Sequence, residues 1–350
     1  MEGKRNYGID LLRLVLMYMV CMLHVLGQGG VLEASVEGTT EYRVFWFLKV
    51  LSYCAVDGFA IISGYMASGK PRKYEKLVEM WLQVLFYSFG ITAILTIIGI
   101  HDVFGKKDIL KSLLPVTSNY YWYFTSFFAL FLSMPVLNKY LFAIDTDTAK
   151  KAFIIIILLF SIMETVSHAF VTNWGYSAIW LMVLYCIGVL AKRIELFEKW
   201  RNTTLIILWA SCIILSWGLY AFAGIGRLIA YVSPTILLSG IIMVVLFSRL
   251  KVKGSIIKKI SPLAFGVYLF QLNCVVWNDI LNTAFFWIVE KPLYIGVAWV
   301  IVFSFALFIA GLLVEYIRSR LAKLLRIPAL SRRIVTWIDV ILNKLCTVLG

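Results

Sequence analysis

The hydrophobic positions along the chain fall into long runs that short polar stretches separate. Each run holds roughly 20 residues, and a helix of that length crosses a bilayer core of about 30 Å. Membrane barrels instead use shorter segments in which apolar and polar residues alternate. The pattern therefore predicts an all-α, polytopic membrane protein with about ten transmembrane helices. The runs lie near residues 8–28, 44–67, 80–100, 121–142, 152–170, 175–191, 204–223, 228–248, 262–282 and 293–317.

The basic residues are spread unevenly over the loops between these predicted helices. Lys and Arg collect in cytoplasmic loops, and this bias sets the orientation of a membrane protein. Ten spans put both termini on one side, and with both termini cytoplasmic the inner loops and the tail hold most of the basic residues. The first outer loop carries Glu33, Glu37 and Glu41 instead. Membrane orientation thus explains the net charge of +14, and no nucleic-acid partner is expected.

The chain is predicted to have two parts. Residues 1–317 form the ten-helix membrane domain. Residues 318–350 mix basic side chains with apolar ones such as Leu321, Ile334 and Trp337, which is typical of an amphipathic helix on the inner membrane surface. No glycine-rich nucleotide loop occurs, and the six cysteines form no CxxC pair, so no metal site is expected. Any chemistry must therefore lie among the helices.

The first predicted helix, "GIDLLRLVLMYMVCMLHVLG" over residues 8–27, contains three ionisable residues. Such residues are costly at membrane depth and are commonly functional. The eleven-residue spacing of Arg13 and His24 puts both on one helix face, about 16 Å apart along the axis. Asp10 lies three residues before Arg13 and can pair with it. His24 is a candidate catalytic residue, and a purely structural histidine is the alternative.

A second stretch, "VDGFAIISGYM" over residues 56–66, places Asp57 in the middle of a span. Its burial requires a partner such as His24 or a water-filled cavity. A carboxylate beside a histidine orients the ring and raises its basicity, so Asp57 is the second candidate catalytic residue. Ser63 and Gly64 are small residues that permit close helix packing, and they are expected to support the site.

A basic cluster follows this helix in "SGKPRKYEKL". On one interpretation the cluster only fixes the orientation of the chain in the membrane. On the other it binds phosphate groups together with Arg13, which is expected at the same membrane level. The cluster comprises Lys70, Arg72, Lys73 and Lys76.

Several segments resemble the acyltransferase 3 family, which consists of integral membrane enzymes that O-acylate cell-surface carbohydrates. Arg13 and His24 after "NYGID", followed by "FAIISGYM", resemble the family's opening. "YYWYFTSFFALFLSMPVLNKYL" (120–141), "WGYSAIWLMVLYCIGVLAKR" (174–193) and "ISPLAFGVYLFQLN" (260–273) are similar to later family segments in the same order. The resemblance covers residues 5–317, nearly the whole chain.

The resemblance implies a bacterial cytoplasmic-membrane enzyme that O-acetylates a polysaccharide. Acyl-CoA, carrying acetyl, would be a co-substrate bound from the cytoplasm, and no cofactor would be tightly bound. Arg13 and the basic cluster would hold its phosphates, and the pantetheine arm would extend toward His24. There His24 would act as general base on a hydroxyl of a saccharide or glycolipid acceptor, with Asp57 as its orienting partner. The axial distance of about 16 Å suits an extended pantetheine arm.

The chain departs from the family pattern at three places, one of which is Phe131, where a tyrosine is common in the family. Many relatives have a second histidine where this chain has Gln271. Glutamine forms hydrogen bonds but does not take up a proton, so its expected role is positional. The basic cluster is also richer in lysine than is typical of the family, and lysine binds phosphate as a point charge rather than through a planar fork.

The acceptor is expected near the outer ends of the helices. Trp122, Glu164 and Trp174 fall at that level, and carboxylates and aromatic rings suit sugar hydroxyls and C–H faces. An interfacial aromatic belt is the alternative interpretation of the two tryptophans.

Two other functions remain open at this point. His24, Asp57 and Glu164 could form the proton relay of a small-molecule transporter, such as the related membrane domain of vancomycin-resistance serine racemases that is thought to handle serine. Transporters commonly contain inverted repeats and broken helices, and the sequence indicates neither. The chain could also be a non-catalytic subunit of polysaccharide assembly or export.

Overall fold

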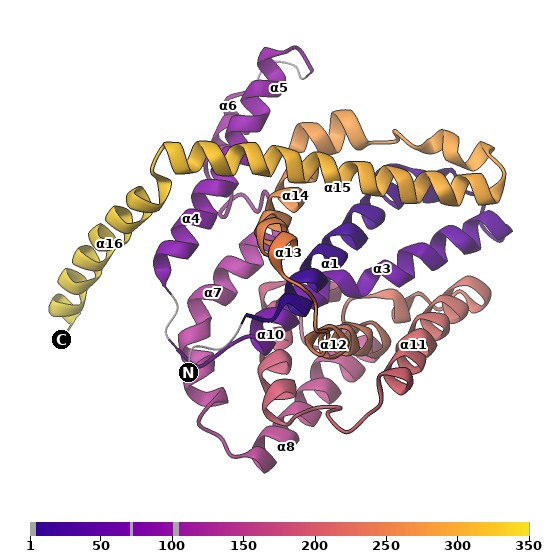
Figure 1. Cartoon of the computed structure of the whole chain (residues 1–350), viewed down its shortest axis with the longest axis horizontal. Helices are drawn as coiled ribbons and strands as arrows, with labels where there is room; N and C mark the ends of the chain where they lie inside the picture. The colour runs from indigo at the N-terminus through magenta and orange to yellow at the C-terminus, as the bar shows by residue number, and fades with distance from the viewer. Residues whose placement is uncertain (1–4, 71–72, 101–104, 350) are drawn as a thin grey trace.

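The chain is helical throughout its described parts, residues 5–70, 73–100 and 105–349 of a computed structural model (Figure 1). No strand occurs in these ranges, which confirms the all-α prediction. The elements are α1 (Tyr7–Leu26), α2 (Val31–Ala34), α3 (Thr40–Tyr65), α4 (Tyr74–Leu85), η1 (Phe86–Ile91), α5 (Thr92–Ile97), α6 (Lys106–Leu113), α7 (Trp122–Leu141), α8 (Thr146–Ile157), η2 (Leu158–Met163), α9 (Glu164–Ser167), η3 (Asn173–Gly175), α10 (Ala178–Arg193), α11 (Asn202–Ala223), η4 (Gly226–Ile229), α12 (Pro234–Ser248), α13 (Ser255–Ile260), η5 (Ser261–Leu263), α14 (Ala264–Gln271), η6 (Val276–Leu281), η7 (Phe286–Glu290), α15 (Leu293–Leu324) and α16 (Ile327–Leu349).

Within the described ranges, seven helices are long and apolar enough to cross a membrane, and one bent helix pair could form an eighth span. The chain is therefore a polytopic membrane protein. The two other predicted spans coincide with α8 to α9 and with α10, which has only 16 residues. The count of ten spans stays a prediction. The seven are Tyr7–Leu26, Thr40–Tyr65, Tyr74–Ile97, Trp122–Leu141, Asn202–Ala223, Gly226–Ser248 and Leu293–Leu324.

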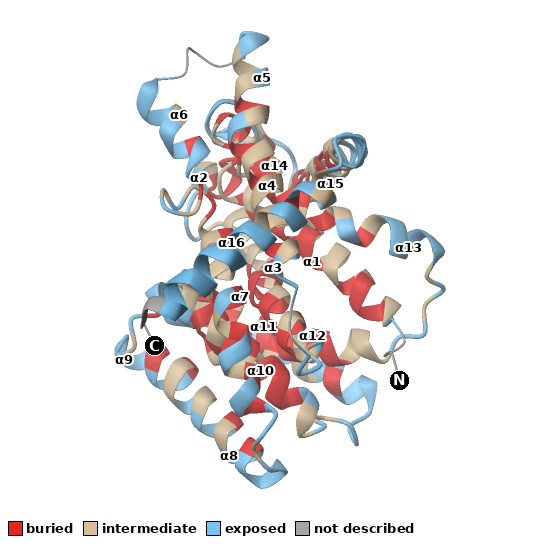
Figure 2. Ribbon diagram, turned by 90° about the vertical axis from the view of Figure 1, so that its left-hand side faces the viewer, coloured by how far each residue is buried: buried red, intermediate tan, exposed pale blue. Residues whose placement is uncertain are grey.

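The core is built around α1, α3, α10 and α12, which carry long runs of buried residues (Figure 2). α3 and α10 cross at glycine. A Cβ added at Gly64 would collide with the backbone oxygen of Tyr185, and one added at Gly188 would collide with that of Ile61. The absence of side chains at both glycines lets the two backbones touch, as expected for Gly64 from its size.

The segment from α13 to η7 is broken. The helices Ser255–Gln271 and Val276–Glu290 meet at an angle of 74°. Buried Asn273 stabilises the break, since its Oδ1 accepts hydrogen bonds from the backbone N–H groups of Val275 and Val276. Its Nδ2 donates to the backbone oxygen of Tyr87 and to Thr92 Oγ1. The expectation that no helix pair is strongly broken is therefore wrong, because one asparagine supplies the caps that the sequence pattern does not reveal.

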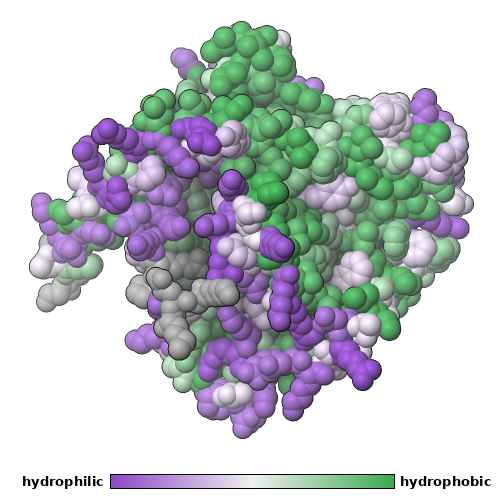
Figure 3. Space-filling model, in the orientation of Figure 1, coloured by the Kyte–Doolittle hydropathy of each residue, from purple (hydrophilic) through white to green (hydrophobic). Residues whose placement is uncertain are grey.

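Several helix ends that are predicted to be cytoplasmic meet at one end of the molecule. Asn6 Nδ2 donates to the backbone oxygen of Ser248 at the end of α12 (2.8 Å), and the hydroxyls of Ser248 and Tyr65 lie 3.3 Å apart. Lys192 lies over the Tyr65 ring, and Arg193 donates to the backbone oxygens of Leu141, the last residue of α7, and of Ile144 beyond it. Figure 3 shows hydrophilic side chains along the lower edge and the left of this view, and a broad hydrophobic face elsewhere.

The C-terminal residues form α16, which follows α15 after a sharp turn (Figure 1). α15 extends to Leu324, beyond the predicted domain boundary at residue 317. The start of α16 packs against α4, where Ser331 Oγ donates to Glu79 Oε1 (3.4 Å), and most of its other side chains are exposed. Its placement on a lipid surface stays a prediction.

Candidate functional site

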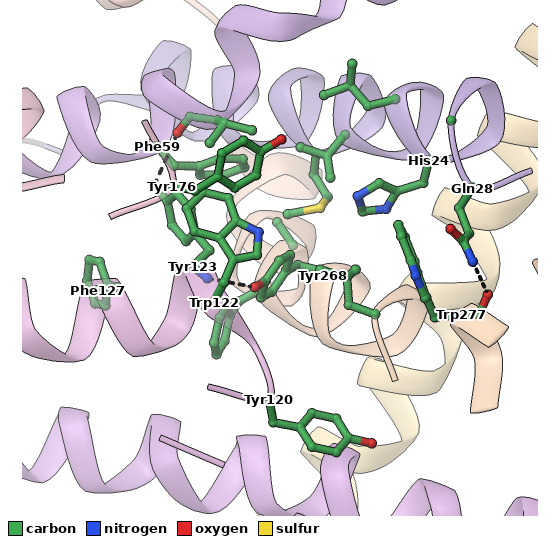
Figure 4. A pocket seen from close by; sticks show the side chains of 18 of the residues that line it. His24, Gln28, Phe59, Tyr120, Trp122, Tyr123, Phe127, Tyr176, Tyr268 and Trp277 are labelled. Atoms are coloured by element: carbon green, nitrogen blue, oxygen red, sulfur yellow. Dashed lines mark hydrogen bonds between the residues drawn. The ribbon is translucent and has the colours of Figure 1, made fainter. Parts of the chain in front are cut away.

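One large cavity, with a volume of about 880 Å³, runs between the helices. α1 contributes Arg13 at one level and His24 at another, so the two polar residues of the first helix line the same space. Figure 4 shows His24 and Trp277 on one side of the cavity and a group of aromatic rings on the other. This aromatic wall consists of Phe59, Trp122, Tyr123, Tyr176 and Tyr268. Such a lining suits an apolar chain or the C–H face of a sugar.

His24 is held by two neighbours from the broken segment. Its Nδ1 lies 2.9 Å from Gln271 Oε1, and Trp277 packs edge-on against its ring at 4.8 Å. The Gln271 amide nitrogen faces the sulfur atoms of Cys21 (3.5 Å) and Met17 (3.9 Å). An amide oxygen only accepts, so Nδ1 of the neutral ring donates and Nε2 keeps its lone pair. The arrangement prepares His24 to accept a proton at Nε2.

The pairing of α1 with α3 sets the depth of each polar residue. Ser52 Oγ lies 3.5 Å from Met22 Sδ, and Gly58 packs against Leu16. The two helices therefore run antiparallel, and Asp57 lies opposite Met17. That level is seven residues from His24, or about 10 Å along the axis.

Asp57 is fully buried and belongs to a different part of the core. Trp180 Nε1 donates to its Oδ1 at 3.0 Å. Its Oδ2 has no hydrogen-bond partner among the described residues, and neither oxygen lines the cavity. The partner of His24 is Gln271 rather than Asp57, so the predicted pairing of the two candidate catalytic residues is wrong. The physical reason is the register of α1 against α3.

The other end of the cavity contains an ion-pair cluster. Asp10 accepts from Arg13 (2.6 Å) and from Arg5 (2.5 Å), which confirms the predicted pairing of Asp10 with Arg13. Arg5 also reaches Ser261 Oγ (3.4 Å). Arg13, Ser261 and Ser63 line the cavity here, and Ser63 Oγ donates to the Phe59 backbone oxygen at 3.0 Å. This end can receive an anionic group at Arg13.

The basic cluster after α3 does not line this cavity in the described residues. Lys70 borders a separate hollow of about 510 Å³ together with Lys139 and Asn138. Lys73 and Lys76 are exposed at the start of α4. Arg72 lies outside the described residues. The phosphate-binding role predicted for the cluster stays a prediction.

The three residues expected to bind an acceptor lie in different places. Trp122 lines the cavity, and its ring packs against Tyr176 at 4.7 Å. Glu164 is buried, and both its oxygens accept from residues 170–172, including Thr172 Oγ1 at 2.5 Å. Trp174 packs on His168 away from the cavity. Glu164 therefore holds the loop at residues 170–172 in place. Neither Glu164 nor Trp174 lies where the predicted contact with an acceptor requires it.

The cavity also contains polar residues that sequence reasoning missed. Lys49 lines it from α3 and Lys111 from α6, and Gln28 and Asn278 lie near His24 and Trp277. A signal for Lys49 was present, because a lysine within the apolar run 44–67 is an ionisable residue at membrane depth. Trp277 and Asn278 gave no such signal, because their approach to His24 depends on the bend between α14 and η6.

Comparison with known proteins gives one match. A family model described as "Acyltransferase domain" matches residues 6–316. No curated protein and no solved structure matches the chain. The matched range contains every residue that lines the cavity, as well as the break between α14 and η6.

Proposed function

The chain belongs to the acyltransferase 3 family, and we propose that it moves an acetyl group from acetyl-CoA to a hydroxyl of an exported or cell-surface saccharide. The observation that carries this proposal is the single cavity lined by both Arg13 and His24. The cavity can hold a donor and an acceptor end to end. Its two ends differ chemically, with an arginine at one and a histidine with a lone pair at the other.

The donor enters at the Arg13 end. The Arg13 guanidinium meets phosphate oxygens of CoA, a pairing that suits its planar donor fork. The axial distance of about 16 Å from Arg13 to His24 corresponds to an extended pantetheine arm. The aromatic wall contacts this arm, and the thioester then reaches the level of His24.

The proton transfer follows from the tautomer that Gln271 selects. As the acceptor hydroxyl oxygen attacks the thioester carbonyl carbon, His24 Nε2 takes the hydroxyl proton. The new C–O bond forms, the C–S bond breaks, and the CoA thiolate takes the proton from the imidazolium. Gln271 holds the ring through Nδ1 but takes no proton itself. Its role is to position His24.

We place the protein in the bacterial cytoplasmic membrane with ten spans and both termini inside. The gathering of helix ends that contain Asn6, Ser248 and Lys192 at one end of the molecule supports this placement. Arg13 lies toward that end and His24 away from it. In this orientation acetyl-CoA comes from the cytoplasm and the saccharide from the outer side.

Labelled acetyl-CoA tests the proposed reaction. Membrane vesicles that contain the protein are expected to transfer the label to surface polysaccharide, and mass spectrometry of glycans from cells with and without the gene is expected to differ by acetyl-sized masses. Glycans of unchanged mass, together with no transfer of label, would contradict the proposal.

Replacing Asp57 with asparagine separates its role from that of His24. Asparagine keeps an oxygen for Trp180 Nε1 and removes a carboxylate that does not line the cavity. We expect acetyl transfer to fall by less than tenfold, which corresponds to about 1.36 kcal/mol in the barrier. The rate is measured in vesicles at equal protein levels. A loss of transfer rate as large as that of a His24→Ala variant would show that the Asp57 carboxylate takes part in the reaction.

Transport is the second candidate, and the broken helix is the observation that favours it. Transporters bind substrate at discontinuous helices, and Gln271 lies at the end of the first half of the bent pair. Uptake of labelled serine into proteoliposomes tests this function. Uptake without any acetyl transfer would favour transport over acyl transfer.

A further inference from the structure

The charges that line the cavity all have one sign. Arg13, Lys49 and Lys111 line it, whereas no aspartate or glutamate does so among the described residues. A cavity with cations only is an unusual feature at membrane depth, because unpaired charges are costly there. The imbalance points to an anion that comes from a ligand.

The positive charge at the donor end is offset only in part, because one carboxylate faces two guanidinium groups. Arg13 forms an ion pair with Asp10, which lies just behind the cavity wall and accepts from Arg5 as well. CoA phosphates would offset the remaining positive charge of this cluster. Among the described residues no carboxylate lines the outer part of the cavity, since Asp57 is bonded to Trp180 in the core and Glu164 is enclosed by its own loop. Lys49 and Lys111 are therefore the cavity cations for which the proposed donor supplies no negative charge.

Lys49 lies at the depth of His24. Ser52 is opposite Met22, so Lys49, three residues further out on α3, is opposite Val25 on the antiparallel α1. Its ammonium lies 4.4 Å from the centre of the Trp46 ring, and its side chain is half-buried. Among the described residues it has no ion pair. Trp46 thus holds a cation at the depth of the predicted base without neutralising it.

The surroundings suit a polar acceptor. Lys111 lines the cavity from α6 and Ser118 from the segment between α6 and α7, and Gln28 and Asn278 line it near His24 (Figure 4 shows Gln28). Ser118 Oγ donates to the Lys111 backbone oxygen at 2.9 Å, which fixes this rim. Amide and hydroxyl groups bind sugar hydroxyls, and the lysines add a requirement for negative charge.

We propose that the acceptor is an acidic saccharide whose anionic group, a carboxylate or a phosphate, is bound by Lys49. This inference rests on the proposed function, since it specifies the class of acceptor. The anion offsets the half-buried ammonium and fixes the sugar so that a neighbouring hydroxyl faces His24 Nε2. Lys49 is a specificity-determining residue, and Lys111 attracts the same charge at the rim.

Binding without any acyl donor tests the inference apart from catalysis. Calorimetry on the purified full-length protein uses three probes: a disaccharide with a glucuronic acid residue, the same disaccharide with its carboxyl reduced to an alcohol, and the neutral disaccharide carrying a phosphate monoester. We expect at least one acidic probe to bind about tenfold or more tightly than the neutral one. The acidic probe that binds tighter identifies the anionic group.

Variants at Lys49 locate the source of the preference. Lys49→Gln is expected to reduce binding of the acidic probe to that of the neutral probe, and Lys49→Arg to retain most of the preference. Lys291→Gln is the matched control, because Lys291 also lies over a tryptophan ring, 5.9 Å from that of Trp287, but outside the cavity. It is expected to bind like the unaltered protein.

Three results of the binding experiment would overturn the inference. These are equal binding of acidic and neutral probes by the unaltered protein, a preference that survives Lys49→Gln, or a loss of neutral-probe binding in Lys49→Gln as large as that of the acidic probe. An effect of Lys49→Gln on the acetyl-transfer rate alone would also overturn it. A protein that prefers the acidic probe but transfers no acetyl would contradict the proposed function while leaving Lys49 as the binding site of an acidic saccharide.

Discussion

Replacing His24 with alanine is expected to lower the rate of acetyl transfer by about 10²- to 10⁴-fold, the range for loss of a general acid–base residue. His24 lines the outer part of the cavity with a lone pair at Nε2 that can accept the hydroxyl proton, and Gln271 orients the ring through Nδ1. Alanine removes the base and leaves Arg13 and the aromatic wall in place. Binding of acetyl-CoA should therefore change little.

The measurement is initial-rate transfer of labelled acetyl in vesicles, with acetyl-CoA binding recorded on the same preparations. His24→Asn controls for folding, because asparagine fills part of the space and can donate to Gln271 but takes up no proton. The transfer rate of Gln271→Leu is expected to lie between those of the unaltered protein and His24→Ala, since this variant keeps the base but loses the hydrogen bond that orients it. Transfer by His24→Ala at the unaltered rate would exclude His24 as the base.

Much of this site could be predicted from local sequence. The spacing of Arg13 and His24 on a helix fixes their shared face, because helical periodicity is a local property. The pairing of Asp10 with Arg13 follows from a separation of three residues, and the structure confirms it. The all-α membrane class follows from the apolar runs, each of which can be assessed by itself.

What the sequence could not supply is the register between distant segments. Whether Asp57 meets His24 depends on how far α3 is shifted along α1, and the contacts of Met22 and Leu16 set that shift. The approach of Gln271 and Trp277 to His24 depends on a bend that Asn273 stabilises. A carboxylate or a glutamine in an apolar run gives no indication of its partner until tertiary packing is known.

Local helix propensity and tertiary packing have opposite effects at the crossing of α3 and α10. Gly64→Ala is expected to destabilise the protein, although alanine normally favours a helix over glycine by about 1 kcal/mol. A Cβ at Gly64 would collide with the backbone oxygen of Tyr185, and a backbone cannot rotate away as a side chain does. The helices must separate, and overpacking of this kind typically costs about 1–3 kcal/mol.

Separation of α3 from α10 should also change the cavity, because α3 supplies Lys49 and Ser63 to the cavity wall. Trp180 on α10 also bonds to Asp57 on α3. Thermal unfolding in detergent measures the effect, with the amount of inserted protein as a second readout. Gly218→Ala is the matched control: Gly218 is also a glycine inside a predicted span, on α11, but no atom lies within contact distance of a Cβ added there. It should show equal or slightly higher stability than the unaltered protein. Both substitutions bring the same gain in helix propensity and differ only in what the new methyl group contacts. If Gly64→Ala were as stable as Gly218→Ala, the close backbone contact between α3 and α10 would therefore not contribute to the stability of the fold.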